Sequence, residues 1–156
     1  MGCSAEPTLH KNYIRLIQLA KEKRVPYVGL TTNAQLLTSV AVEKLIAIGL
    51  DEITISVHGV HKSSYDHFMD GGQYENLIEK LKILKELKIN KGQSKPNLRI
   101  NYTVNEDNLN ELTDFFEVFG DFGIDTLQVR PMADVGKTNY EYRKFNDHHT
   151  QRYEEI

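Results

Sequence analysis

The stretch EITISVHG, residues 52–59, decides the fold, because isoleucine and valine alternate in it with threonine, serine and histidine. Alternation with a period of two is typical of a strand that has one apolar face and one polar face. The stretches RINYTV (99–104) and LQVR (127–130) repeat the pattern. We therefore predict strands at about 52–57, 98–104 and 126–130, with helices on the apolar face and solvent or a ligand on the polar face.

Helical periodicity fills the segments around these strands. Apolar residues recur at helical spacing over about 9–23, 39–48, 77–87 and 109–119. Thr8 is the predicted cap of the first helix, Gly49 ends the second, and Asn108 with Glu111 has capping-box spacing. The run VPYVGLTT (25–32) indicates a further short strand, and residues 58–72 are predicted to form a polar loop.

Strands that alternate with helices of this length favour right-handed crossovers and a mainly parallel sheet. A parallel sheet covered on both faces would have nearly continuous apolar strands, and these strands have one polar face instead. The predicted fold class is therefore α/β, a partial, open TIM-like (β/α) barrel with a mainly parallel sheet. With 156 residues the chain is long enough for one such unit.

Composition excludes some function classes. Hydrophobic residues make up 40% of the chain and charged residues 26%, as in globular proteins. The 19 basic and 22 acidic residues give a formal net charge of -3, so neither nucleic acid nor an anionic membrane is an expected partner. Cys3 is the only cysteine, and there is no long apolar span, so we expect a cytoplasmic protein without an internal disulfide.

The candidate binding residues are polar and lie where the predicted strands end, because ligands of parallel α/β folds usually bind at the carboxyl ends of the strands. Such a set suits the amino, carboxylate and ribose groups of a nucleotide-like ligand, with Glu6 accepting from an ammonium and Arg130 facing a carboxylate. The full set is Glu6, Thr32, Asn33, Ser56, His58, Asn101, Thr103, Gln128 and Arg130.

Several segments resemble motifs of the radical S-adenosylmethionine (radical SAM) enzymes, in the family's order. SAEPTLH (4–10) resembles the GGEP motif, TTNAQLL (31–37) resembles the TNG segment, and ISVHG (55–59) is similar to ISLDG or ISLHG. After this motif, residues 63–84 (SSYDHFMDGGQYENLIEKLKIL) resemble the family's approach to the next helix. Residues 99–112 (RINYTVNEDNLNEL) resemble the family's fifth strand and the start of the helix after it. Together the resemblance covers about residues 3–131.

The resemblance implies a partial barrel that binds S-adenosylmethionine on its inner face, where a [4Fe-4S] cluster reduces it to a 5′-deoxyadenosyl radical. Glu6 matches the glutamate of GGEP, whose segment contacts the methionine amino group. Asn33 matches the TNG segment, and Ser56 matches the serine of ISLDG. Asn101 and Val129 lie on strands that flank ribose and adenine in this family.

Two departures from the family pattern matter. Ser4 and Ala5 replace the paired glycines, and the CxxxCxxC segment is absent, so Cys3 alone cannot supply the three thiolates of a cluster. We therefore expect residues 1–135 to be an incomplete radical SAM core that is inactive by itself, followed by a polar C-terminal tail, 136–156, with at most one helix. Cluster ligands would exist only in a full-length protein.

Other interpretations stay open. The alternative function is a non-catalytic α/β module that acts through binding or self-association, and under either interpretation a homo-oligomer is expected through the exposed sheet edge. Glu6 could be a carboxylate beside a helix N-terminus, and Ser56 and Asn101 could hydrogen-bond neighbouring backbone. His58 and His61 lack a third ligand at suitable spacing, so no metal site is predicted. The substrate is unknown.

Overall fold

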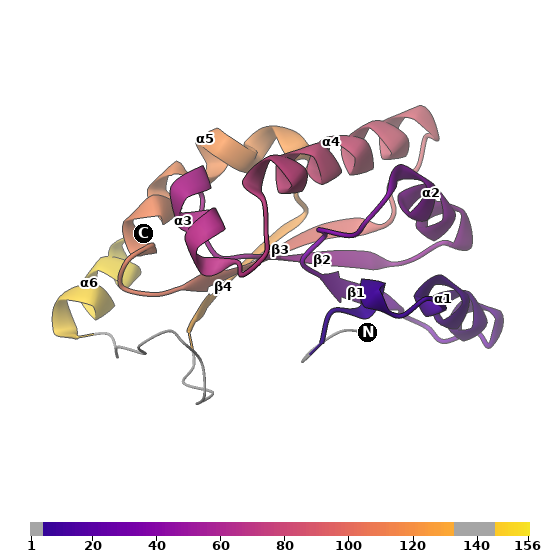
Figure 1. The fold of residues 1–156 in the computed structure, drawn as a ribbon, viewed down its shortest axis with the longest axis horizontal. Coiled ribbons are helices and arrows are strands. Elements are labelled where there is room, and N and C mark those ends of the chain that lie inside the picture. Colours follow the sequence, from indigo (N-terminus) through magenta and orange to yellow (C-terminus); the bar gives the residue numbers. More distant parts are fainter. Residues whose placement is uncertain (1–4, 133–145) are drawn as a thin grey trace.

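The computed structural model of the chain describes residues 5–132 and 146–156. Four strands form one parallel sheet in sequence order, so each connection returns to the next position along the sheet. They are β1 (Gly29–Thr32), β2 (Glu52–Val57), β3 (Asn97–Val104) and β4 (Thr126–Pro131). The sheet is open rather than closed (Figure 1), which confirms the predicted α/β class and the partial, TIM-like barrel.

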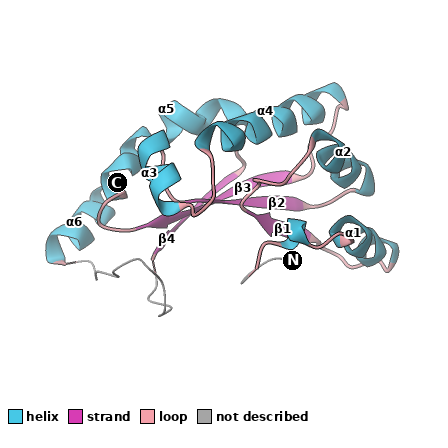
Figure 2. Cartoon of the chain, viewed as in Figure 1, coloured by secondary structure: helices cyan, strands magenta, loops and turns pink. Residues whose placement is uncertain are grey.

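Helices connect the strands and lie along one side of the sheet. Figures 1 and 2 show α2, α3, α4 and α5 over this side, with α1 beside β1. The α-helices are α1 (Tyr13–Glu22), α2 (Ser39–Ile48), α3 (Lys62–Phe68), α4 (Tyr74–Asn90), α5 (Phe115–Phe119) and α6 (Asp147–Glu155), and the 3₁₀ helices are η1 (Pro7–Leu9), η2 (Leu109–Asp114) and η3 (Gly120–Phe122).

The strand register separates an apolar face from a polar face, as the alternation predicted. Ile55, Ile100 and Leu127 are register partners on the covered face, where leucines of α4 and the rings of α5 complete the core. Each such side chain, when fully buried, stabilises the fold by roughly 1.5–3 kcal/mol. The intervening residues of β2, β3 and β4 lie on the other face.

The second helix agrees with its prediction in both bounds and signals. α2 runs over Ser39–Ile48, Thr38 Oγ1 accepts from the Ala41 N–H at 3.1 Å, and Gly49 ends the helix at φ 75°. A left-handed φ at this position suits glycine, which has no Cβ to clash.

The predicted start of the first helix is wrong. α1 begins at Tyr13, and Leu9 is 73% exposed rather than packed in a helical stripe. Thr8 does not cap α1, because its N–H and its hydroxyl both donate to Glu6 Oε1, at 3.0 and 2.6 Å. A local carboxylate therefore holds Thr8 within the short helix η1.

Two further predictions need correction. The segment 58–72, predicted as a polar loop, contains α3. The capping box of Asn108 and Glu111 does not form, and the chain there enters η2 before the short helix α5. Instead of forming the cap, the Asn108 side chain bonds His58 O and the Glu111 side chain bonds Val60 N–H, both about 50 residues earlier in the sequence.

The two ends of the chain are described in part. Cys3 and Ser4, and residues 136–145 of the predicted tail, lie outside the described residues, while the remainder of that tail contains α6. In the part of the chain that the structure describes, no helix combines the length and apolarity that crossing a membrane requires.

Candidate functional site

A row of three uncharged polar residues crosses the polar face of the sheet. Ser56 of β2 is the register partner of Asn101 of β3, which is in turn the partner of Gln128 of β4. The row spans about 10 Å, since neighbouring strands lie about 4.8 Å apart. One step further toward the carboxyl ends, Thr103 pairs with Arg130. The sheet thus brings together five of the residues predicted to bind a ligand: Ser56, Asn101, Thr103, Gln128 and Arg130.

Asn101 is the feature of this row that points most directly to a ligand. Its Oδ1 atom is buried and accepts no hydrogen bond from any described residue. Leaving a buried acceptor unpaired costs about 1–3 kcal/mol, so such atoms are normally paired with a ligand or water. The amide therefore suits a donor of a bound molecule.

Charges on the polar face differ between its two ends. At the amino end, Arg99 Nη2 donates to Glu52 Oε2 at 3.0 Å. Burial would raise the pKa of Glu52, but hydrogen bonds from Arg99, Tyr27 and Thr54 hold it below its usual value. At the carboxyl end, Arg130 is exposed and donates only to Gln128 Oε1, at 3.0 Å, within the described ranges. A cation that has no carboxylate partner among residues 5–132 and 146–156 suits an anionic group of a ligand.

Glu6 joins η1 to the carboxyl end of β1. Its Oε1 accepts from the hydroxyl of Thr32 at 2.7 Å as well as from Thr8, and its Oε2 accepts from Asn33 N–H at 2.7 Å. Partial burial would raise the pKa of this carboxyl, yet the hydrogen bonds from Thr8, Asn33 and Thr32 outweigh burial and lower it. Three donors saturate Oε1, so only Oε2 can accept from a ligand.

The turn after β1 shows why this segment has the sequence TTNA. The Asn33 side chain accepts from Gln35 N–H at 3.1 Å, and the Thr32 hydroxyl accepts from Ala34 N–H at 3.0 Å. Ala34 adopts φ 63°. This left-handed conformation favours glycine, the residue of the TNG segment at this position. Glu6 and Asn33 are thus brought together as one unit beside β1.

Asn108 aligns the carboxyl ends of β2 and β3. It is fully buried, and its Nδ2 donates to His58 O at 2.8 Å and to Thr103 O at 3.0 Å. Its Oδ1 accepts from Asn105 N–H at 2.7 Å. These bonds fix the backbone of His58 next to β3. Burial lowers the pKa of the His58 imidazole, which favours its neutral form.

Glu111 fixes the loop that follows β2. Its Oε2 accepts from Val60 N–H at 2.8 Å, from His61 N–H at 3.3 Å and from the Ser64 hydroxyl at 2.6 Å. A carboxylate at the start of α3 also suits the positive end of the helix dipole. Gly59 makes this packing possible, because a Cβ there would meet Ser64 Oγ and Tyr65 N. The glycine of ISVHG is therefore a packing requirement.

The structure separates Val129 from the other predicted residues. Val129 is the register partner of Tyr102 and packs against the core on the covered face, so its side chain does not reach the polar row. Only its backbone lies at the level of that row. Asn108 and Glu111, which fix the loop after β2, were predicted only as a helix cap. Their partners are about 50 residues away, so a local pattern could not show this role.

The histidines do not form a metal centre with other residues. His61 Nε2 lies 3.0 Å from Asp114 Oδ2, in an exposed pair. Residues 5–132 and 146–156 contain no group of three or more histidine, cysteine, aspartate or glutamate side chains arranged to hold a metal ion.

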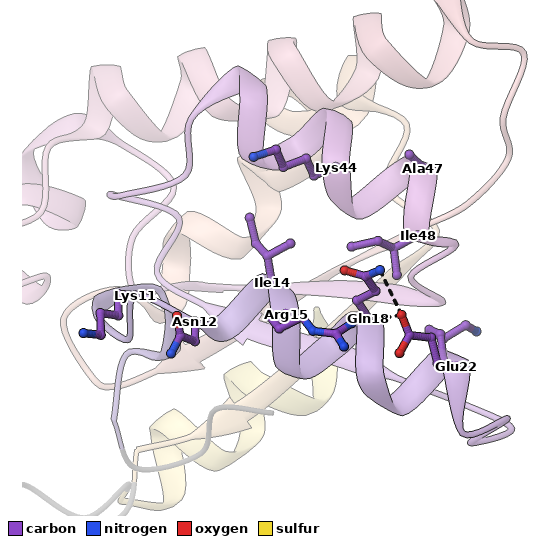
Figure 3. Close-up of a pocket in the computed structure, with 10 residues that line it drawn as sticks. Lys11, Asn12, Ile14, Arg15, Gln18, Glu22, Lys44, Ala47 and Ile48 are labelled. Atoms are coloured by element: carbon purple, nitrogen blue, oxygen red, sulfur yellow. Dashed lines mark hydrogen bonds and ion pairs between the residues drawn. The ribbon is translucent and has the colours of Figure 1, made fainter.

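A separate groove of about 640 Å³ lies between α1 and α2. Figure 3 shows Ile14 of α1 and Ile48 of α2 in the groove, with Lys44 on the α2 side and Lys11 near the start of α1. The polar row of the sheet contributes no residue to it.

Comparisons with known proteins agree on one family. A family model described as the radical SAM superfamily matches residues 2–119. Curated relatives include a probable GTP 3',8-cyclase of Sulfurisphaera tokodaii, 27% identical over 141 residues that are 89% of this chain and 43% of the relative. Another, from Saccharolobus solfataricus, is 25% identical over 142 residues, 91% of this chain and 44% of the relative. The chain thus spans less than half the length of these relatives.

Solved structures share the fold. Streptococcus suis SuiB bound to S-adenosylmethionine superposes with a TM-score of 0.78 at 20% identity, over 97% of this chain and 33% of SuiB. SuiB bound to its precursor peptide SuiA gives a TM-score of 0.77 at the same identity, over 97% of this chain and 32% of SuiB.

Proposed function

Because the chain belongs to the radical SAM superfamily, we propose that it is the cofactor-binding part of a radical SAM enzyme and that its polar sheet face binds S-adenosylmethionine. The observation that carries this proposal is the row of Ser56, Asn101 and Gln128 with the buried, unpaired Oδ1 of Asn101. The binding of S-adenosylmethionine by SuiB, which has the same fold, is consistent with it.

The residues present fit the groups of S-adenosylmethionine. Asn101 would accept from a hydroxyl or amino group, and Ser56 beside it can donate or accept. Glu6 Oε2 together with Asn33 would face the amino group from the end of β1, while Arg130, three strands away on β4, would face a polar group at the adenosine end of the cofactor. Val129 would take part only through its backbone at the level of the row.

The chain's own residues do not fit a [4Fe-4S] cluster, because Cys3 is the only cysteine in the sequence and three thiolates are needed. In this family the cluster supplies the electron that cleaves S-adenosylmethionine to the 5′-deoxyadenosyl radical. We assign no such step to this chain. Any cluster ligands would come from residues outside this sequence.

The names of the related proteins point to two substrate classes, a nucleotide and a peptide. The curated relatives are named for GTP, and SuiB is bound to a precursor peptide. The segment shared with each is less than half of the relative. The alternative function is a non-catalytic module that retains the fold, and such a module needs no binding of S-adenosylmethionine.

Calorimetry with S-adenosylmethionine tests the proposal. We expect weak, saturable binding that Asn101→Ala weakens about tenfold, since one hydrogen bond contributes about 1.4 kcal/mol. Asn97→Ala, at the exposed start of the same strand, is the matched control and should leave affinity unchanged. Equal affinity of the wild type and Asn101→Ala, with both folded by thermal melting, would place the cofactor elsewhere. No binding to the wild type would favour the non-catalytic module.

A further inference from the structure

The charges of this chain are segregated far more than its net charge of -3 indicates. Residues 11–24 carry five basic residues and one acidic residue, a net charge of +4. Residues 106–125 carry seven acidic residues and no lysine or arginine, a net charge of -7. The first segment contains α1, and the second contains η2, α5 and η3. Figure 1 shows α1 beside β1 at one end of the molecule and α5 beyond α4, so that α2 and α4 stand between α1 and α5.

The basic end has an apolar groove with cations around it. Ile14, Ala47 and Ile48 line the groove between α1 and α2, and Lys11 and Lys44 also line it (Figure 3). Neither lysine pairs with a carboxylate of the described residues, whereas Arg15 in the same groove is bonded to Glu22 at 2.9 Å. The groove therefore favours an apolar group that is accompanied by negative charge.

The acidic end presents such a group. Phe116 of α5 is 70% exposed, although its neighbours Phe115 and Phe119 are fully buried. Glu117 follows Phe116 in α5, and Asp121 lies in the next helix, η3, so both carboxylates are close to the ring in sequence. Both are exposed, and neither is paired with a cation of the described part of the chain. The acidic segment thus offers an exposed aromatic ring together with two carboxylates that the described residues leave unpaired, which is complementary in charge to the groove.

We propose that these two surfaces bind each other between copies of this chain, with Phe116 of one copy in the α1–α2 groove of the next and Glu117 and Asp121 facing Lys44 and Lys11. α4 lies between the groove and α5 in one molecule, so a single copy cannot close the contact on itself (Figure 1). The contact therefore forms between copies, either twice in a two-fold dimer, in which each copy offers its groove to the other, or head-to-tail in a ring or an open chain. This inference is independent of cofactor binding and uses a surface other than the sheet edge.

Charge reversal separates this interface from other modes of association. Lys44→Glu and Glu117→Lys should each weaken self-association about tenfold or more, because like charges then face each other. A mixture of the two variants should associate again, since each altered surface meets its complement. Lys82→Glu, an exposed lysine of α4 away from the groove, is the matched control and should associate as the wild type does.

Sedimentation velocity across a concentration series is the measurement. The wild type should associate at 50 mM salt and dissociate at 1 M salt, where the screening length falls to about 3 Å. Phe116→Ser should associate more weakly than the wild type at 50 mM salt, while its thermal melting stays near that of the wild type because the ring is exposed. A monomeric wild type, or association that neither charge reversal alters, would overturn the proposal. The second result would leave the sheet edge as the contact.

Discussion

Asn108→Ala is expected to destabilise the protein by about 3–5 kcal/mol. The substitution removes an acceptor of the Asn105 N–H at 2.7 Å and the donors to His58 O and Thr103 O at 2.8 and 3.0 Å. Asn108 is 0% exposed, so water does not readily replace it. Each lost bond removes about 1 kcal/mol, and each stranded buried group adds about 1–3 kcal/mol before the site relaxes.

Urea unfolding measures this loss. With a slope of about 2 kcal/mol/M, the midpoint should fall by roughly 2 M. Asn110→Ala is the matched control, because Asn110 is exposed and, among the described residues, its side chain bonds only Arg152, at 3.2 Å. The free energy of unfolding of this variant should stay within about 0.5 kcal/mol of that of the wild type. If the two variants unfold at the same midpoint, Asn108 does not align β2 with β3 as argued.

Asn108→Asp adds a pH signature to the same test. The introduced carboxyl faces two carbonyl oxygens in a buried site, so its folded-state pKa is expected above the unfolded value of about 3.9. The folded state then binds more protons than the unfolded state, and the destabilisation should be smallest below pH 4 and grow as the pH rises. A loss of stability that does not change with pH would contradict this reasoning.

Three other predictions concern separate parts of the chain. Gly59→Ala should prevent native packing of α3, because the new Cβ meets Tyr65 N, and circular dichroism melting should show a large loss that Gly120→Ala, in open space, does not share. Asp51 is buried, which by itself raises its pKa, but Lys21, Lys95 and Val28 N–H lower it overall. Its stabilisation is present above the unfolded pKa of about 3.9 and is lost as the pH falls toward the folded value, so Asp51→Asn should be less stable at pH 7 and should lose less on acidification. Equal urea midpoints of the wild type and Asp51→Asn at pH 7 would refute a stabilising role of the Asp51 carboxylate. Anaerobic reconstitution should leave the chain without a stoichiometric [4Fe-4S] cluster, whereas about four irons per chain would show that Cys3 is not the limiting ligand.

The local signals in the sequence predicted the elements that rest on local physics. The period-two alternation at 52–57 and 98–104 depends on which face is buried, and it gave both the strands and their polar face. α2 was predicted within its bounds because its periodicity and the glycine that ends it are local features of the sequence.

The remaining features depend on partners that are distant in sequence. Asn108 and Glu111 have capping-box spacing, but their side chains bond the end of β2 and the start of α3, about 50 residues earlier. A local pattern contains no information on such contacts. Val129 was placed on the correct strand, but the register turns its side chain toward the core. The signal that could have shown this was its apolar character within the alternation.

The most direct test of the account is an NMR titration of the isotope-labelled chain with S-adenosylmethionine. We predict saturable shifts that are largest at Ser56, at Gln128 and at the side-chain amide of Asn101, with little change at Asn97 on the opposite end of β3. NMR suits this measurement because weak binding still produces shifts. Largest shifts at Ile14 and Ile48 in the α1–α2 groove, or none that saturate, would contradict the claim that the polar row of the sheet binds the cofactor.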